Sequence, residues 1–169
     1  AQYLLGRMYY LGEGVPENAV EAVRWLRKAA DQGIVDAEYS LGGMYANGEG
    51  VPENDAEAVK WYRKAASHGY LDAQYNLALM YYDGDGVPES SVHAYAWLSL
   101  AKTQGQADAA SSPDILKPRI AKQQARAADS LEILKPRMTK QQIAQGQALA
   151  TQCYESDYKD CDWRAVKSM

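Results

Sequence analysis

The sequence contains no phenylalanine and has only two histidines, two cysteines and six prolines in 169 residues. No apolar stretch approaches the roughly 20 residues that a membrane-spanning helix requires. The first residues also lack the basic segment followed by an apolar one that marks a signal peptide. We therefore expect no transmembrane helix. Because the sequence starts inside a repeat, we do not expect residue 1 to be the natural N-terminus.

Apolar residues make up 47% of the chain, and they are mostly Ala, Leu, Tyr and Met with four Trp. This set favours helices over the β-branched cores of sheets, and we predict an all-α protein. The net charge of -4 conceals a split along the chain. Residues 1–110 carry 8 basic and 15 acidic side chains, whereas residues 111–149 carry 7 basic and 3 acidic ones. A basic segment thus follows an acidic one.

The sequence repeats itself with a period of 36 residues, a sign of a stacked repeat protein. The three copies start at Ala1, Ala37 and Ala73 and read AQYLLGRMYYLGEGVPEN, AEYSLGGMYANGEGVPEN and AQYNLALMYYDGDGVPES. The second halves of the copies also align, with tryptophan at Trp25, Trp61 and Trp97 and glycine at Gly33, Gly69 and Gly105.

Each copy is predicted to form two helices. In the second copy, helix A spans residues 36–47, starts at Asp36 as a capping residue and ends before a Gly-x-Gly-Val-Pro loop. Helix B spans residues 55–67, where Asn54 is placed to cap it, and stops at Gly69 in a left-handed conformation. Because one such pair cannot bury its own apolar stripe, the repeats must stack on one another.

The residues that are the same in all three copies are the predicted packing set. They are Tyr3, Tyr39 and Tyr75; Leu5, Leu41 and Leu77; Met8, Met44 and Met80; and Tyr9, Tyr45 and Tyr81. Small residues at one position of helix A, namely Gly6, Gly42 and Ala78, are expected to let neighbouring helices approach closely.

The motifs A-x-x-x-L-G-x-M-Y-x-x-G-x-G-V and A-x-x-W-x-x-K-A-A-x-x-G resemble those of the Sel1-like repeat family, relatives of tetratricopeptide repeats. The resemblance covers residues 1 to about 110, with small departures at Ala78 and Lys102. It implies a right-handed α/α solenoid with helix A on the concave wall and a role as a scaffold or adaptor. We assign residues 1–108 to three repeats and residues 109–169 to a helical C-terminal capping region.

A second duplication, of 18 residues, lies in the C-terminal third, where residues 115–124 match residues 133–142. Pro118 and Pro136 predict that helices end or kink near the lysine before each. Thr139 and Gln142 form a capping box that starts a terminal helix over residues 140–155. The sequence leaves open whether the duplication adds a helix or extends one.

The two cysteines, Cys153 and Cys161, are eight residues apart, as are Ala29 and Ala37 on either side of a turn between repeats. If the cysteines flank a similar turn, their side chains lie within disulfide range. The cysteine-rich secreted branch of the Sel1-like family has disulfides at this spacing, so the resemblance implies a disulfide and a periplasmic or secreted protein. A pair of reduced thiols in a cytoplasmic protein is the alternative, and zinc is not expected because two ligands are missing.

The sequence shows no arrangement of side chains typical of catalysis or metal binding. We therefore predict that the protein is not an enzyme and holds no cofactor or metal. His68 replaces glutamine and His93 replaces glutamate of the other copies, so both are expected on the polar surface without the partner that a general base needs. The segment Asp83-Gly-Asp-Gly is predicted to be a turn, because the later ligands of a calcium loop are absent.

The positions that differ between copies form the candidate binding face. Positions 4, 7 and 11 of each copy lie on one stripe of helix A, and we predict that this stripe binds a protein or peptide, with mere structural freedom as the alternative. The stripe comprises Leu4, Arg7, Leu11, Ser40, Gly43, Asn47, Asn76, Leu79 and Asp83, and it is flanked by Tyr10 and Tyr82.

Two other functions are alternatives to a protein-binding scaffold. One is a cell-wall or β-lactam-directed binding protein or enzyme, for which the sequence shows no activated nucleophile. The other is binding of nucleic acid or an anionic surface through Lys117, Arg119, Lys122, Arg126, Lys135, Arg137 and Lys140. The overall pI near 5.2 favours a different role for these residues, as a basic cap that lies against the acidic repeats, so we do not expect nucleic-acid binding. Neither the partner nor the oligomeric state can be named from the sequence.

Overall fold

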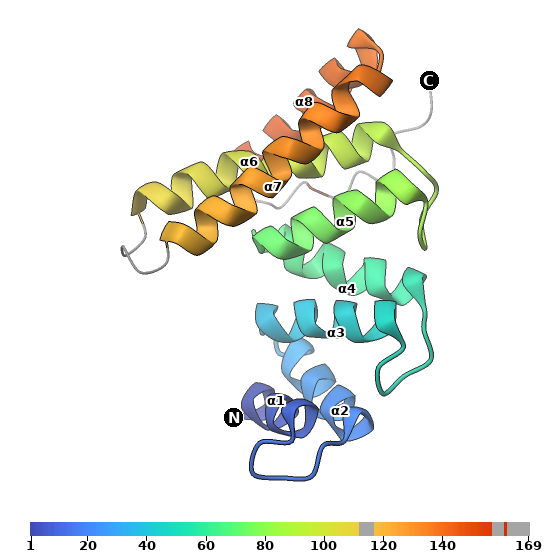
Figure 1. Cartoon of the computed structure of the whole chain (residues 1–169), viewed down its shortest axis with the longest axis vertical. Coiled ribbons are helices and arrows are strands. Elements are labelled where there is room, and N and C mark those ends of the chain that lie inside the picture. The colour runs from blue at the N-terminus through green and yellow to red at the C-terminus, as the bar shows by residue number, and fades with distance from the viewer. Residues whose placement is uncertain (112–116, 157–160, 162–169) are drawn as a thin grey trace.

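The computed structural model describes residues 1–111, 117–156 and 161, and within these residues the regular structure is entirely helical. The helices are α1 (Gln2–Leu11), α2 (Ala19–Ala30), α3 (Val35–Asn47), α4 (Asp55–Ser67), α5 (Leu71–Asp83), α6 (Ser91–Ser111), α7 (Lys117–Leu134) and α8 (Lys140–Glu155), with a short 3₁₀ helix at Lys135–Arg137. Figure 1 shows α1 to α6 as successive antiparallel pairs stacked along the long axis. The predicted α/α solenoid is confirmed.

The helix boundaries follow the predicted capping residues at most ends. The side chains of Asn18 and Asn54 each accept a hydrogen bond, at 3.1 Å, from the backbone N–H three residues on, at the starts of α2 and α4. Gly48 ends α3 with a positive φ of 68°. These bonds and turns fix where helix A stops and helix B begins in each repeat.

The predicted cap at Asp36 is wrong. Helix α3 begins at Val35, and the residue before it, Ile34, has no side-chain hydrogen bond to the helix. Asp36 lies inside the first turn, where its negative charge is still favourable next to the free N–H groups. The turn before it is closed by the backbone, since Ile34 N–H donates to the carbonyl of Ala29 at 3.2 Å. No side-chain cap is needed there.

The core runs through the stack as a continuous cluster of aliphatic and aromatic side chains. Leu41 and Leu77 are completely buried, and Trp97 is 1% exposed. The equivalent Leu5 is only half-buried, because within the described chain α1 has a neighbouring repeat on one side only. Burial of these side chains is the main source of the stability of each repeat.

Helix A and helix B approach most closely at the position of the small residues. A Cβ atom built on Gly42 would lie 2.5 Å from Cδ1 of Tyr62, and one on Gly6 would lie 2.8 Å from Cγ of Leu26. These separations are shorter than any carbon contact tolerates. The predicted close approach is therefore confirmed, and glycine is required wherever the facing side chain is as large as tyrosine.

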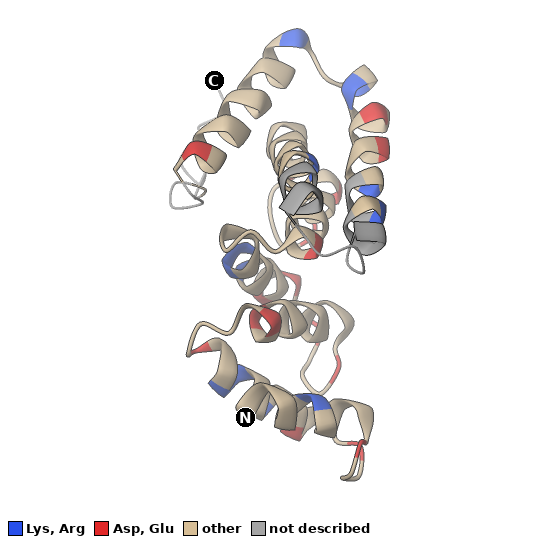
Figure 2. Ribbon diagram, turned by 90° about the vertical axis from the view of Figure 1, so that its left-hand side faces the viewer, with Lys and Arg blue, Asp and Glu red and all other residues tan. Residues whose placement is uncertain are grey.

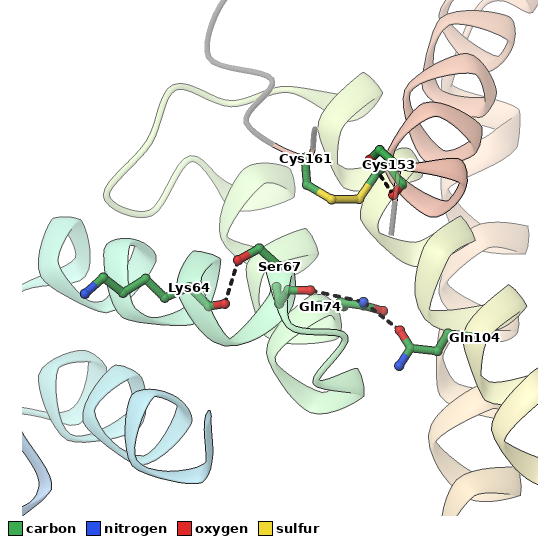
Figure 3. Close-up of a disulfide and its surroundings, with 8 residues drawn as sticks. Lys64, Ser67, Gln74, Gln104, Cys153 and Cys161 are labelled. Atoms are coloured by element: carbon green, nitrogen blue, oxygen red, sulfur yellow. Dashed lines mark hydrogen bonds between the residues drawn. A yellow bond between two sulfur atoms is a disulfide. The ribbon is translucent and has the colours of Figure 1, made fainter. Parts of the chain in front are cut away.

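A buried polar pair recurs between helix A and the end of the next helix B. In the second repeat the carboxylate of Glu38, only 3% exposed, lies 3.1 Å from Nδ1 of His68. In the third repeat Gln74, fully buried, donates to the amide oxygen of Gln104 at 3.0 Å (Figure 3). His68 is thus an exposed residue, as expected, but it also satisfies a buried acid.

His93 is not the plain surface residue that the sequence predicts. Its ring is half-buried and stacks on Tyr81, with ring centroids 4.8 Å apart, and its Nδ1 lies 2.6 Å from the hydroxyl of Ser90. The packing of α6 on α5 brings the ring against a tyrosine that the sequence already placed in the core. This contact cannot be read from the position of His93 in its own helix.

The C-terminal part departs from the repeat at α6. Gly105 aligns with glycines that end helix B in the first two copies, yet α6 continues through it to Ser111. The 18-residue duplication adds a helix of its own, α7, between the two Lys-Pro pairs, and the predicted capping box of Thr139 and Gln142 starts α8. Figures 1 and 2 show α7 and α8 packed along opposite sides of α6, so both cover the long helix that connects them to the repeats.

Cys153 and Cys161 form a disulfide, with their Cα atoms 4.8 Å apart (Figure 3). Both residues are buried, and Cys153 lies in the last turn of α8. The pairing predicted from the spacing and the family resemblance is confirmed. The bond ties the segment after α8 to the end of that helix.

We expect Gly42→Ala to destabilise the protein by about 1–3 kcal/mol, because the added methyl group overlaps the ring of Tyr62 and forces the two helices apart. Thermal and urea denaturation followed by circular dichroism would measure the loss. Gly43→Ala, whose Cβ would lie 3.6 Å from the Tyr62 hydroxyl, is the matched control and should cost nothing, since alanine favours the helix. Adding Tyr62→Leu, which copies the Ala78 and Leu98 pair at the same positions of the third repeat, should rescue Gly42→Ala; equal stability of Gly42→Ala and Gly43→Ala would contradict the argument.

We expect His68→Ala to cost about 1–3 kcal/mol in unfolding free energy, because it removes the hydrogen-bond partner of the buried Glu38 carboxylate. The double variant Glu38→Gln with His68→Gln copies the Gln74 and Gln104 pair and should restore most of that stability. Chemical denaturation of the three proteins at neutral pH measures both effects. If the double variant is no more stable than His68→Ala, then the pair is not what stabilises this position.

Candidate functional site

The helix-A face has a hollow between the first two repeats. It lies between α1 and α3, has a volume of about 140 Å³ and includes Leu26 of α2 in its lining. The lining residues are Arg7, Tyr10, Leu26, Ser40, Gly43, Met44, Asn47 and Glu49. Four of the predicted binding residues, Arg7, Ser40, Gly43 and Asn47, are therefore brought together here, with Leu26 and Met44 as the apolar part of the lining.

The polar edge of this hollow is built around the carboxylate of Glu49. One of its oxygens accepts a hydrogen bond from the hydroxyl of Tyr10 at 2.7 Å, and the other accepts one from the amide of Asn47 at 3.0 Å. The bond from Tyr10 joins the first repeat to the second. Sequence comparison did not single out Glu49, because an acidic residue stands at this loop position in every copy.

The hollow is electrostatically negative at Tyr10. The hydrogen bond to Glu49 raises the pKa of Tyr10, burial raises it further, and the charges of Glu49 and Glu17 act in the same direction. The charges that raise this pKa are thus the carboxylates of Glu49 and Glu17. Arg7, which is exposed, is the cation in the lining, and no hydrogen bond or ion pair to it occurs among the described residues.

The remaining wall of the hollow is made of small side chains on α3. Ser40 turns its hydroxyl back to donate to the carbonyl of Asp36 at 2.7 Å, and Gly43 leaves open the space in front of the Tyr62 hydroxyl. The result is a concave surface whose shape depends on the absence of large side chains at positions 40 and 43.

Other predicted binding residues are used within the fold or lie apart from the hollow. Asn76 makes a side-chain hydrogen bond to Tyr62, so it is not a free surface residue. Burial raises the pKa of Tyr62 to about 12, while the bond from Asn76 acts in the opposite direction. Leu4 and Leu11 are exposed on α1, at 59% and 46%, but do not line the hollow.

The third repeat has α7 beside its helix-A face. The guanidinium of Arg126 lies 4.4 Å from the ring centroid of Tyr75, and the Ser130 hydroxyl donates to the Tyr75 hydroxyl at 3.4 Å. Arg137 donates a hydrogen bond to the hydroxyl of Tyr82. Tyr82, a predicted partner contact, is therefore already engaged by the chain itself, although its neighbours Leu79 and Asp83 remain exposed.

The basic segment does lie next to the repeats, but its contacts differ from those predicted. Arg126 and Arg137 meet tyrosines of α5 instead of carboxylates, and Lys135 pairs with Glu132 in its own helical segment at 2.7 Å. Lys122 and Lys140 are exposed. The side chains of Lys117 and Arg119 lie outside the described residues.

A second hollow, of about 730 Å³, lies between α6, α7 and α8, and sequence analysis gave no sign of it. Its floor includes Tyr95 and Leu100 of α6, and its rims carry Lys135 on one side and Glu155 on the other. It exists because α7 and α8 straddle α6. Because no repeat period predicts that arrangement of helices, the sequence contains no pattern from which this hollow could be predicted.

The described part of the chain shows no group of three or more His, Cys, Asp or Glu side chains placed to hold a metal ion. None of its helices is long and apolar enough to cross a membrane. The segment after Asp83 is a turn, as predicted, with Gly84 at a φ of 80°.

Comparison with known proteins gives one consistent result. The family model of the Sel1 repeat matches residues 1–34, 35–70 and 71–106. Among solved structures, a Sel1 repeat protein from Oxalobacter formigenes is 30% identical with a TM-score of 0.60, and the match covers 76% of this chain and 57% of that one. The protein c5321, described as a protective antigen of uropathogenic Escherichia coli strains with an SLR fold, is 24% identical with a TM-score of 0.67, and the match covers 99% of this chain and 41% of that one.

The chain therefore spans about half the length of these two solved proteins. No curated protein matches it. The second likeness, at 24% identity, shows the fold alone.

We expect Arg126→Ala to loosen α7, because it removes the guanidinium group that packs over Tyr75, a contact worth about 0.5–1 kcal/mol. Hydrogen–deuterium exchange should show faster exchange of α7 amides than in the parent, with α1 to α4 unchanged. Lys122→Ala removes a cation from the same helix that lies on no aromatic ring among the described residues; it is the control and should leave exchange unaltered. Equal protection of α7 in both variants would show that the contact does not hold the helix in place.

Proposed function

The chain belongs to the Sel1 repeat family, whose members generally mediate protein–protein interaction, and from this membership we propose that it is a non-catalytic scaffold that binds a protein or peptide on its helix-A face. The binding residues are the part of the predicted stripe that lies at the hollow between α1 and α3. The single observation that carries this proposal is the convergence of Arg7, Ser40, Gly43 and Asn47, from two different repeats, on one concave surface.

Several physical features support a peptide as the occupant. The hollow combines an apolar lining of Leu26 and Met44 with polar groups at its edge, as interaction sites typically do. In the third repeat Tyr75 meets α7 and Tyr82 meets Arg137 just after it, so binding is centred on the first two repeats. We place the helix-A face on the concave wall of the solenoid, as the resemblance to Sel1-like repeats implies.

The proposal includes the compartment. The disulfide between Cys153 and Cys161 is favoured where the surroundings are oxidising, which supports a periplasmic or secreted protein. Mass measurement of the protein purified from its source, with and without reductant before alkylation, tests this part separately. Two free thiols in the freshly isolated protein would contradict it.

The binding face is tested by capture of partners from an extract of the source organism with the whole chain as bait. Two variants are compared with the parent: Ser40→Arg with Asn47→Arg, which fills the hollow, and Leu4→Arg with Leu11→Arg, which changes exposed residues of α1 outside it. We expect the first variant to lose at least tenfold of the captured partner and the second to retain it. Circular dichroism and thermal unfolding first establish that both variants are folded.

Retention of the partner by the hollow-filling variant would overturn the proposed face. Loss in the Leu4 and Leu11 variant alone would move the site away from the hollow, to the exposed leucines of α1 on the same stripe. Either result would refute the location of the binding site at the hollow, and neither would affect the membership in the Sel1 repeat family.

A further inference from the structure

The third repeat shows what the tyrosines of helix A bind when a long basic side chain is available. From α7, Arg126 places its guanidinium 4.4 Å from the ring centroid of Tyr75, and the guanidinium of Arg137, just after the helix, lies 5.9 Å from that of Tyr82 and bonds its hydroxyl. Both distances are in the range of attraction between a cation and an aromatic ring. The chain itself thus supplies two arginines to two tyrosines of one helix.

The first repeat has the same two tyrosines but no arginine from its neighbour. Tyr3 and Tyr10 stand two periods before Tyr75 and Tyr82. The next helix, α3, presents Ser40, Gly43, Met44 and Asn47 toward this region, none of them a cation, and the space that remains is the hollow of about 140 Å³. A cavity of about 150 Å³ admits a group of benzene size, so this space suits the end of one long side chain.

The charges around the hollow favour a cation. Glu49 is held in place by two neutral donors, and a carboxylate has about four acceptor sites, so it can accept another hydrogen bond. Glu49 and Glu17 both act on the Tyr10 hydroxyl, and residues 1–110 carry 15 acidic against 8 basic side chains. The ring of Tyr10, 41% exposed, offers a face for the cation to lie on.

Arg7 opposes a cationic ligand, since it also lines the hollow. Its side chain is exposed, however, so solvent screens its charge more than that of the half-buried Glu49, which is hydrogen-bonded in place. The third repeat has Leu79 at this position, between the two tyrosines that bind arginine. Arg7 therefore weakens the attraction without reversing it.

We propose that the hollow between α1 and α3 receives an arginine or lysine side chain of the partner, which lies against Tyr10 and pairs with Glu49. This inference rests on the proposed function and specifies the chemistry of the partner as a cationic peptide segment. The partner's cation takes the place next to Tyr10 that Arg137 takes next to Tyr82.

The test uses three synthetic peptides of one alanine and glutamine sequence that differ at three positions, which carry arginine, citrulline or glutamate. Citrulline has the shape of arginine without its charge. Each peptide is titrated into the ¹⁵N-labelled full chain, and amide shifts of Ser40, Gly43 and Asn47 give the dissociation constant. We expect the arginine peptide to bind roughly five- to tenfold more tightly than the citrulline peptide.

Three variants test which charges at the hollow cause the preference for arginine over citrulline. Glu49→Gln should remove most of the preference for arginine over citrulline, because it removes the negative charge but keeps an acceptor, and only the attraction to the ring of Tyr10 remains. Arg7→Leu, which copies the third repeat, should increase the preference. Glu53→Gln, in the same loop but outside the lining of the hollow, is the matched control and should leave the preference within about twofold of the parent's.

Equal binding of the arginine and citrulline peptides would overturn the inference, as would tighter binding of the glutamate peptide, which would make Arg7 the anchor for an anion. These outcomes differ from failure of the proposed function. If the hollow-filling variant loses its captured partner while no peptide prefers arginine, then the face binds a partner whose chemistry is not cationic.

Discussion

The contact between the two helices of a repeat is the constraint on which the rest of the structure depends. At Gly42 the backbone of helix A lies so close to Tyr62 that no side chain fits between them. This short distance lets the leucines and methionines of helix A fill the space between successive pairs without voids. The A helices of neighbouring repeats lie next to each other on one face, where Arg7 of α1 and Ser40 of α3 line the same surface.

The shape of the helix-A face follows from what stands between those neighbouring helices. Where α7 and the short helix after it supply arginines, the tyrosines of α5 are engaged, and where α3 supplies Ser40 and Gly43, a hollow remains. The same stack thus has one occupied and one open position, although its core residues hardly change between copies. Interaction sites can vary in this way because the packing set carries the stability and leaves the other positions free.

The sequence predicted the parts of this structure that depend on local periodicity. The 36-residue period gave the helix pairs, the caps at Asn18 and Asn54, and the close approach at Gly42. It could not give features that arise between distant segments. Asp36 is not a cap because α3 starts one residue earlier, at Val35, and places Asp36 inside the first turn, and α6 runs on past Gly105 where α7 and α8 pack along it.

The candidate site was predicted only in part, for the same reason. Variation between copies pointed to Arg7 and Ser40, but it missed Glu49, which varies little because every copy has an acid there. Variation also could not show that Asn76 bonds Tyr62 or that Tyr82 bonds Arg137. Those uses depend on residues 14 and 55 positions away along the chain, and a comparison confined to one helix does not detect them.

The placement of α7 and α8 on opposite sides of α6 has a consequence for how such a protein can evolve. In a regular solenoid every repeat offers its successor the same surface, so copies can be gained or lost at any junction by unequal recombination. Here α6 is covered by α7, a helix that arises from a separate duplication of 18 residues, and by α8 on the other side. A repeat inserted directly after α6 would have to compete with α7 and α8 for the surface of α6, whereas a change in copy number upstream of α6 would leave it intact.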